Sequence, residues 1–182
     1  MSGARDALVV VLVLLALLSL AWYLSWTATR LDRLHARVEG ARSALDAQLV
    51  RRASIALELA TSGLLDPATA VLLAGAAHEA REREGDTREL SESDLTAALQ
   101  AALQPEAVKE LRADPLGDEL ITELASATRR VTLARRFYND AVRAVRVVRA
   151  KRTVRLLRLA GHAPMPASFE MDDAIPSTLT TP

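Results

Sequence analysis

The first hydrophobic pattern in the chain is an uninterrupted apolar run over residues 7–26, which contains no charge, proline or glycine. In a helix, these residues would extend roughly 30 Å, the thickness of the hydrocarbon core of a bilayer. Because a helix satisfies its own backbone groups, lipid can surround it. Trp22, Tyr23 and Trp26 lie at its far end, and aromatic residues of this kind are typical of the membrane–water interface. The pattern predicts a transmembrane helix over residues 7–26, preceded by a short flank, residues 1–6.

A cleaved signal peptide is the competing interpretation of this run. Signal peptides have apolar runs of about 7 to 15 residues that end at small residues. Here the run is longer and ends in bulky aromatic residues. We therefore expect a retained single-pass anchor.

Basic residues flank the predicted membrane helix unequally. Arg5 precedes it, whereas Arg30, Arg33, Arg37 and Arg42 follow it. Only Lys and Arg count strongly in the positive-inside rule. This bias predicts a protein of the cell membrane whose C-terminal domain lies in the cytoplasm.

Downstream of residue 26, apolar residues recur with a period near 3.5 in two long stretches without proline. In residues 27–62 the two columns read Leu31, Val38, Leu45, Arg52, Leu59 and Leu34, Ala41, Gln48, Ile55, Ser62. In residues 118–160 they read Leu124, Val131, Tyr138, Val145 and Leu120, Ala127, Ala134, Ala141, Val148. These are a and d positions of the coiled-coil type, so we expect two long helices with facing seams, the first of them continuous with the membrane helix.

Turn and capping residues predict shorter helices between the two long ones. Asp66 and Pro67 suit the N-cap and first position of a helix that runs to Arg83. Ser91 and Asp94 fit a capping box and predict the start of another helix.

The end of the second long stretch marks the predicted end of the domain. Gly161 ends the helix, and the four prolines and several hydroxyl residues of residues 162–182 indicate a flexible C-terminal tail. The predicted fold is therefore all-α. It consists of the N-terminal transmembrane helix followed by an antiparallel three- or four-helix bundle with long helices, residues 27–161.

The zero net charge of the chain conceals an asymmetry. Residues 129–158 carry an excess of about ten positive charges, whereas residues 79–123 are acidic by about eight. Acidic helices packed beside the basic one, or solvated faces, explain this most simply, and contact with anionic lipid headgroups is an alternative. Nucleic acid is not expected as a partner, because only Phe137 and Tyr138 offer stacking surfaces on the basic helix.

Gln48 and Arg52 occupy seam positions where a helical zipper would carry apolar residues. A buried Arg needs a partner, and we expect Tyr138, Asn139 and Asp140 on the second long helix to supply one. The resulting cluster either fixes the register of the helices or forms a ligand site.

Chemistry-bearing patterns are otherwise scarce. The chain has no Cys, and its three histidines lie far apart without i, i+4 companions. No catalytic triad, phosphate loop or dinucleotide fingerprint is present. We expect neither a metal nor a cofactor, and no enzymatic activity.

Two motifs give the chain a resemblance to LemA proteins. Residues 45–52 read Leu-Asp-Ala-Gln-Leu-Val-Arg-Arg, and residues 134–142 read Ala-Arg-Arg-Phe-Tyr-Asn-Asp-Ala-Val. The second is similar to the signature of that family, and residues 161–164 with Phe169 and Glu170 resemble the end of its domain. The chain looks like a divergent member, since Ile55 to Glu58 stands where the family usually has Ile-Pro-Asn.

The resemblance implies a membrane-attached helical bundle without catalytic activity. Our first hypothesis is a scaffold or adaptor that contacts the bilayer through residues 7–26 and binds an unidentified protein partner. The second is a sensor or ligand-binding domain in envelope signalling. Homo-oligomerisation remains open in both. The residues that carry either role would be Gln48, Arg51, Arg52, Tyr138, Asn139 and Asp140.

Overall fold

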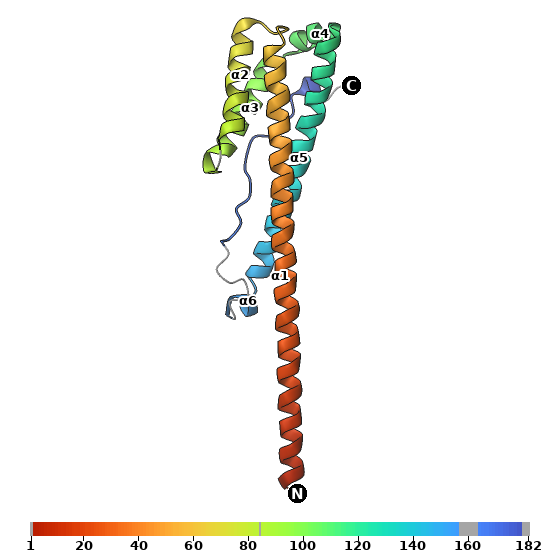
Figure 1. Ribbon diagram of the computed structural model, residues 1–182, viewed down its shortest axis with the longest axis vertical. Helices are drawn as coiled ribbons and strands as arrows, with labels where there is room; N and C mark the ends of the chain where they lie inside the picture. The colour runs from red at the N-terminus through yellow and green to blue at the C-terminus, as the bar shows by residue number, and fades with distance from the viewer. Residues whose placement is uncertain (1, 84, 157–163, 180–182) are drawn as a thin grey trace. The chain divides into compact units, whose positions relative to one another are not determined.

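The computed structural model (Figure 1) describes residues 2–83, 85–156 and 164–179. Within these residues the chain forms six α-helices and two short 3₁₀ helices, and no strand occurs. A long apolar N-terminal helix is followed by shorter helices that pack together. The predicted all-α fold is therefore confirmed.

The chain divides into two compact units. Unit 1 comprises Met1–Glu39 and Ala141–Ala167, and unit 2 comprises Gly40–Asp140 and Ser168–Pro182. The elements are α1 (Ser2–Thr61), α2 (Pro67–Glu82), η1 (Gly85–Thr87), α3 (Arg88–Ala102), α4 (Pro105–Ala113), α5 (Pro115–Arg149), α6 (Arg152–Leu156) and η2 (Ser177–Leu179). Helices α1 and α5 contribute to both units.

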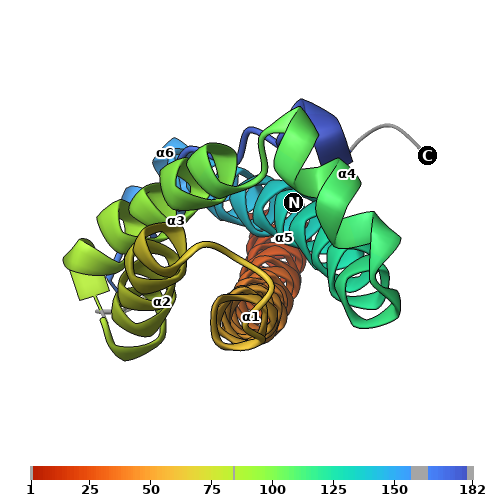
Figure 2. The ribbon, with the colours of Figure 1, turned by 90° about the horizontal axis from the view of Figure 1, so that it is seen from above.

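The core of unit 2 combines apolar side chains from all of its helices. Representative members are Leu59 of α1, Leu73 of α2, Leu99 of α3 and Leu124 of α5, each no more than 1% exposed. Helix α4 adds Val108 and Leu111. Figure 2 shows these helices end-on, with α2 and α3 to one side of α1 and α4 and α5 to the other.

The heptad columns read from the sequence match the burial of side chains. All five residues of the first column in α1 are buried: Leu31, Val38, Leu45, Arg52 and Leu59. In α5, Leu124, Val131, Tyr138 and Val145 are buried as well. The 3.5-residue period thus identified the inner faces of both long helices. In unit 2 these faces meet a core shared by several helices, which differs from a two-helix coiled coil.

Aspartate side chains start two of the helices. Asp66 Oδ1 accepts hydrogen bonds from the backbone N–H groups of Ala68 and Thr69, at 3.1 Å each, as predicted for α2. The hydrogen bonds from Thr69 lower the pKa of Asp66. Asp114 Oδ1 accepts equivalent bonds from Leu116 and Gly117, at 2.9 and 3.1 Å. Helix α5 therefore starts at Pro115, three residues before the predicted start at Asp118.

Two other predicted helix boundaries are wrong. Helix α3 begins at Arg88, so Ser91 is an internal residue, and its hydroxyl donates to the Thr87 carbonyl instead of capping the helix. Helix α5 ends at Arg149, and after a turn the short α6 begins at Arg152. The predicted helix end at Gly161 lies outside the described residues.

Unit 1 contains a small apolar cluster and a long exposed apolar surface. Val154 of α6 packs with Leu31 of α1 and with Val148 of α5, across the turn that follows α5. Within the described residues, one helix is long and apolar enough to cross a membrane: α1, from Ala7 onward. No residue in its most apolar window is buried.

The C-terminal segment, which we expected to be flexible, packs against unit 2 in its described part. Leu179 is 2% exposed and belongs to the core of unit 2, and Ile175 packs against that core. The prolines and hydroxyl residues that indicated a tail are present, but these two apolar side chains and a series of hydrogen bonds hold residues 168–179 in place. We call this stretch the C-terminal strap. Residues 162, 163 and 180–182 lie outside the described part of the chain.

Candidate functional site

Arg52 lies at the centre of a buried polar cluster in unit 2. Its side chain is 1% exposed, and its Nη2 donates to Glu92 Oε2 at 2.7 Å and to the Glu92 carbonyl at 3.0 Å. Its Nη1 donates to Thr96 Oγ1 at 3.0 Å. Glu92 and Thr96 are 0% and 2% exposed. The guanidinium of α1 is thus held by one face of α3.

Burial dominates the electrostatics of Glu92. Desolvation raises the pKa of its carboxyl above the ordinary value, and the Arg52 guanidinium opposes this shift by attraction and by its hydrogen bond. Arg88, one turn earlier on α3, also lowers the pKa of Glu92, whereas Asp46 raises it. Arg88 and Asp46 themselves form an ion pair at 3.2 Å, and both are less buried than Glu92. Two ion pairs therefore join α1 to α3, one buried and one near the surface.

Several atoms of the cluster lack hydrogen bonds. Arg52 Nε, Glu92 Oε1 and Gln48 Oε1 are buried and have no hydrogen-bond partner among the described residues. A buried polar atom without a partner costs about 1 to 3 kcal/mol. The cluster therefore contributes to the specificity of helix packing more clearly than to stability.

The cluster is linked to the C-terminal strap through Thr96. The hydroxyl accepts from Arg52 and lies 2.8 Å from the Asp172 carbonyl and 3.0 Å from the Glu92 carbonyl. Because a hydroxyl has one proton, it can donate to only one of these carbonyls at a time. Thr96 thus connects α1, α3 and the strap.

Other polar side chains of α3 hold the strap along its length. Glu89 Oε1 accepts from the Glu170 N–H, Ser93 Oγ accepts from the Asp172 N–H, and Gln100 Nε2 donates to the Ala174 carbonyl. With Thr96, these residues are three or four positions apart and form one stripe along the helix. The strap therefore runs parallel to α3, with its backbone bonded to side chains.

Helix α5 holds the strap from the other side. The Asn139 side chain donates to the Phe169 carbonyl at 3.1 Å and accepts from the Phe169 N–H at 2.9 Å, as a paired strand would. Arg135 Nε and Nη2 reach the two oxygens of Asp173 at 3.1 and 2.9 Å. This is the bidentate geometry in which Arg binds a carboxylate most specifically.

The six residues predicted from the sequence have separate roles. Arg52 is buried, but its partners are Glu92 and Thr96 of α3, so the prediction that residues 138–140 supply them is wrong. Gln48 is half-buried beside this cluster, and Arg51 faces outward and pairs with Glu123 at 3.3 Å. Asn139 binds the strap, whereas Tyr138 is buried and Asp140 exposed.

A signal for Glu92 and Thr96 was present in the sequence. Glu92 stands three and seven residues before Leu95 and Leu99, on the apolar face of its helix, where a carboxylate is unusual. The predicted partners of Arg52 all lay on the second long helix, so its contacts with α3 were not foreseen.

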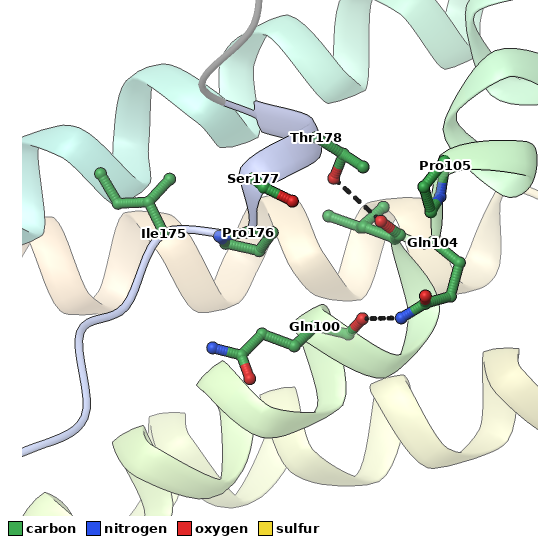
Figure 3. A pocket seen from close by; sticks show the side chains of 8 residues that line it. Gln100, Gln104, Pro105, Ile175, Pro176, Ser177 and Thr178 are labelled. Atoms are coloured by element: carbon green, nitrogen blue, oxygen red, sulfur yellow. Dashed lines mark hydrogen bonds between the residues drawn. The ribbon is translucent and has the colours of Figure 1, made fainter.

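A pocket of about 240 Å³ lies elsewhere, where the strap crosses the end of α3 and the start of α4 (Figure 3). It is lined by Gln100, Leu103, Gln104, Pro105, Ile175, Pro176, Ser177 and Thr178. The Gln104 side chain donates to the Gln100 carbonyl at 2.7 Å, and Thr178 Oγ1 donates to the Leu103 carbonyl at 2.8 Å. These hydrogen bonds occupy polar groups of the wall. None of the six predicted residues lines this pocket.

Metal-ligating side chains do not gather in groups of three or more within the described residues. His78 does have an i, i+4 neighbour that we overlooked, because its Nε2 lies 3.3 Å from Glu82 on the exposed face of α2. A single exposed pair of this kind is an ordinary helix-surface contact.

No family model, curated protein or solved structure matches the chain.

Proposed function

We propose that this chain is a membrane-anchored scaffold or adaptor of the LemA type, without catalytic activity. Residues 7–26 form its single membrane span, and its helical domain lies in the cytoplasm and binds a protein partner. The resemblance to LemA proteins depends on the two sequence motifs, which contribute Arg52 and Asn139 to the contacts of unit 2.

The observation that carries the proposal is the contrast along the single helix α1. Leu14 and Leu15 are 54% and 55% exposed, whereas Leu45, Leu49 and Leu59 are at most 1% exposed. Other parts of the chain cover Leu45, Leu49 and Leu59. Leu14 and Leu15 are not covered, so an apolar medium outside the chain would have to surround them. A bilayer is the medium that matches an uncharged helical segment of this length.

The closed polar cluster favours a scaffold over a ligand-binding sensor. Arg52 and Glu92 are fully buried and bonded to each other. A ligand could reach them only after the helices or the strap moved. The pocket near Gln104 is lined by other residues and does not open onto this cluster.

A surface on α5 has the composition expected for a protein partner. Leu133 and Phe137, one turn apart, are 51% and 65% exposed. Arg130 and Arg136 flank them, and neither forms an ion pair with any of the described residues. Exposed aromatic residues surrounded by Arg are enriched at protein interfaces.

Labelling of a single cysteine tests the topology. The chain has no Cys of its own, so Ala97→Cys, on the exposed face of α3, provides a unique reporter in unit 2. We expect a membrane-impermeant maleimide to label it only after the cells are permeabilised. Labelling in intact cells would contradict the cytoplasmic location, and recovery of the protein in the soluble fraction would contradict the anchor.

Photo-crosslinking tests the partner surface. A photoreactive amino acid at Phe137 should give a discrete crosslinked species of fixed mass in cells. The same amino acid at the exposed Glu119, on an earlier part of α5, is the control. Identical products from both positions would argue against a specific site at Phe137.

A further inference from the structure

Basic side chains from two distant parts of the sequence gather in unit 1, beside the end of the apolar segment of α1. Arg30, Arg33 and Arg37 belong to α1, and Lys151, Arg152 and Arg155 belong to α6 and the turn before it. We call these six residues the basic collar. We propose that the basic collar binds the headgroups of anionic phospholipids around the membrane helix.

The packing of α6 places its cations at this level. Val154 is 2% exposed and packs with Leu31 of α1, which is 1% exposed. Leu31 follows Trp26 by five residues, or roughly 7.5 Å along the helix. Figure 1 shows α6 beside this part of α1. Residues more than 110 positions apart in sequence are thus brought to the exit of the apolar segment.

This position corresponds to the headgroup layer. The bilayer including headgroups is about 10 to 15 Å thicker than its hydrocarbon core, so each headgroup layer extends roughly 5 to 8 Å. Trp26 marks the interface, and the Arg30 guanidinium lies 5.6 Å from the centre of its ring. A lipid phosphate beside Trp26 would therefore be within a Debye length, about 8 Å, of Arg30, the member of the collar nearest to it.

The cations of the collar are available to bind an anion. Lys151, Arg152 and Arg155 are exposed, and within the described part of the chain none of them forms an ion pair with an acidic side chain. Two neighbouring arginines are engaged differently, because Arg146 and Arg149 donate to the carbonyls of Pro166 and Pro164. The three cations of α6 and its preceding turn are therefore exposed at the surface of unit 1.

The charge balance favours lipid as the occupant. Asp32 is the single acidic residue between Arg30 and Arg37, and residues 151–155 contain none. Each basic residue near an anionic membrane surface contributes about a fivefold increase in affinity. The cations of the collar nearest Trp26 would concentrate anionic lipid around this helix.

The inference rests on the proposed membrane anchor, and one experiment separates the two. The chain contains two tryptophans, Trp22 and Trp26, and both lie at the exit of the apolar segment. Their fluorescence is quenched by brominated lipid that touches them. The full chain is reconstituted into vesicles of phosphatidylcholine and phosphatidylserine at four to one, in which either the first or the second lipid is brominated.

We expect brominated phosphatidylcholine to quench the tryptophans, as any inserted helix requires. We expect brominated phosphatidylserine to quench several-fold more per mole of quencher, and this excess to decline at 0.5 M salt. The variant K151Q/R152Q/R155Q should lose most of the excess and keep its quenching by brominated phosphatidylcholine. The matched control R81Q/R83Q/K109Q removes three charges from exposed positions of unit 2 and should retain the excess.

The outcomes are distinguishable. Absence of quenching by brominated phosphatidylcholine would overturn the membrane anchor itself. Equal quenching per mole by both lipids in the unmodified chain would overturn the collar and leave the anchor intact. An equal loss of the excess in both triple variants would also overturn the collar, because it would show that net charge alone attracts the lipid.

Discussion

Units 1 and 2 contain the same types of apolar residue but differ in how far these side chains are exposed. In unit 2, core leucines of four helices are no more than 1% exposed, because each helix covers the others: Leu59 of α1, Leu73 of α2, Leu99 of α3 and Leu124 of α5. In unit 1, the leucines and valines of residues 8–20 are at least 50% exposed, and the buried cluster consists of Leu31, Val148 and Val154. Unit 2 is therefore stabilised by its own packing, whereas the described part of the chain leaves the apolar segment of unit 1 uncovered. Substitutions in the two units should be detected by different measurements.

The largest expected effect is the removal of one partner from the buried ion pair of unit 2. Glu92→Leu leaves the Arg52 guanidinium buried without a counter-charge and should lower the free energy of unfolding by about 3 to 5 kcal/mol. Arg52→Met should cost less, because Glu92 can become protonated and Arg cannot lose its proton. Urea unfolding followed by circular dichroism measures both.

The double variant R52M/E92L sharpens this result. Apolar residues of similar volume commonly replace a buried ion pair with little loss of stability. We expect the double variant to be more stable than E92L. Additive losses from the two substitutions would show that the residues stabilise unit 2 independently.

The next effect concerns unit 1 alone. Leu15→Arg places a charge in the middle of the apolar segment and should cost about 2.5 to 3.5 kcal/mol of membrane insertion. The fraction of protein that resists alkaline extraction should fall, while the melting temperature of unit 2 stays the same. Leu116→Arg, at a 46% exposed leucine of unit 2, is the control and should change neither quantity. A lower melting temperature of unit 2 in the L15R variant would show that the stabilities of the two units are coupled.

Glycine substitutions in unit 2 give a smaller effect that depends on the space available. A Cβ at Gly117 would overlap the backbone carbonyl of Leu111, so Gly117→Ala should destabilise by about 1 to 3 kcal/mol. Gly75 lies within α2 and has nothing within 4 Å of an added Cβ. Gly75→Ala should therefore stabilise by about 0.5 to 1 kcal/mol, because it favours the helix. Thermal melts of the two variants should shift in opposite directions, and a shift in the same direction would contradict the tight contact at Gly117.

The smallest expected effect is on pH dependence. The pKa of Glu92 in the folded protein is raised above its ordinary value of 4.5, so between these two values the folded state binds more protons than the unfolded state. The contribution of Glu92 to stability is therefore fully present below 4.5 and is lost as pH rises through the raised pKa. We expect the unfolding free energy of the unmodified chain, relative to E92Q, to decline over this window. A relative increase would show that the attraction of Arg52 outweighs burial.

Periodicity predicted the inner faces of the long helices, because burial of every third or fourth residue follows from helix geometry. Leu31 to Leu59 in α1 and Leu124 to Val145 in α5 were read correctly, and so was the N-cap at Asp66. The start of α3 was predicted at Ser91 instead of Arg88, because the capping-box pattern of Ser91 and Asp94 was preferred over the N-cap residue Thr87.

The candidate site was predicted in part. Arg52 was recognised because a charge at a seam position contradicts the apolar pattern. Its partner Glu92 was not recognised. The residues around Glu92 include many exposed acids, and only its spacing from Leu95 distinguishes it from them. The strap could not be predicted from residue types, since its contacts use backbone carbonyls and N–H groups that every residue has. The Asn139 side chain, for example, forms two hydrogen bonds with the backbone of Phe169, which lies thirty residues further along the chain.

The contacts of the C-terminal strap also give the assembly of this protein an order in time. The Glu170 N–H bonds to Glu89 across 81 positions, and Leu179 packs in the core of unit 2, so these contacts can form only after residue 179 has been made. At a synthesis rate of about 5 to 20 residues per second, Leu179 is added roughly 8 to 30 s after Trp26. In the proposed arrangement, the apolar segment reaches the bilayer during this interval. The protein would therefore be tethered to its membrane before its helical domain closes.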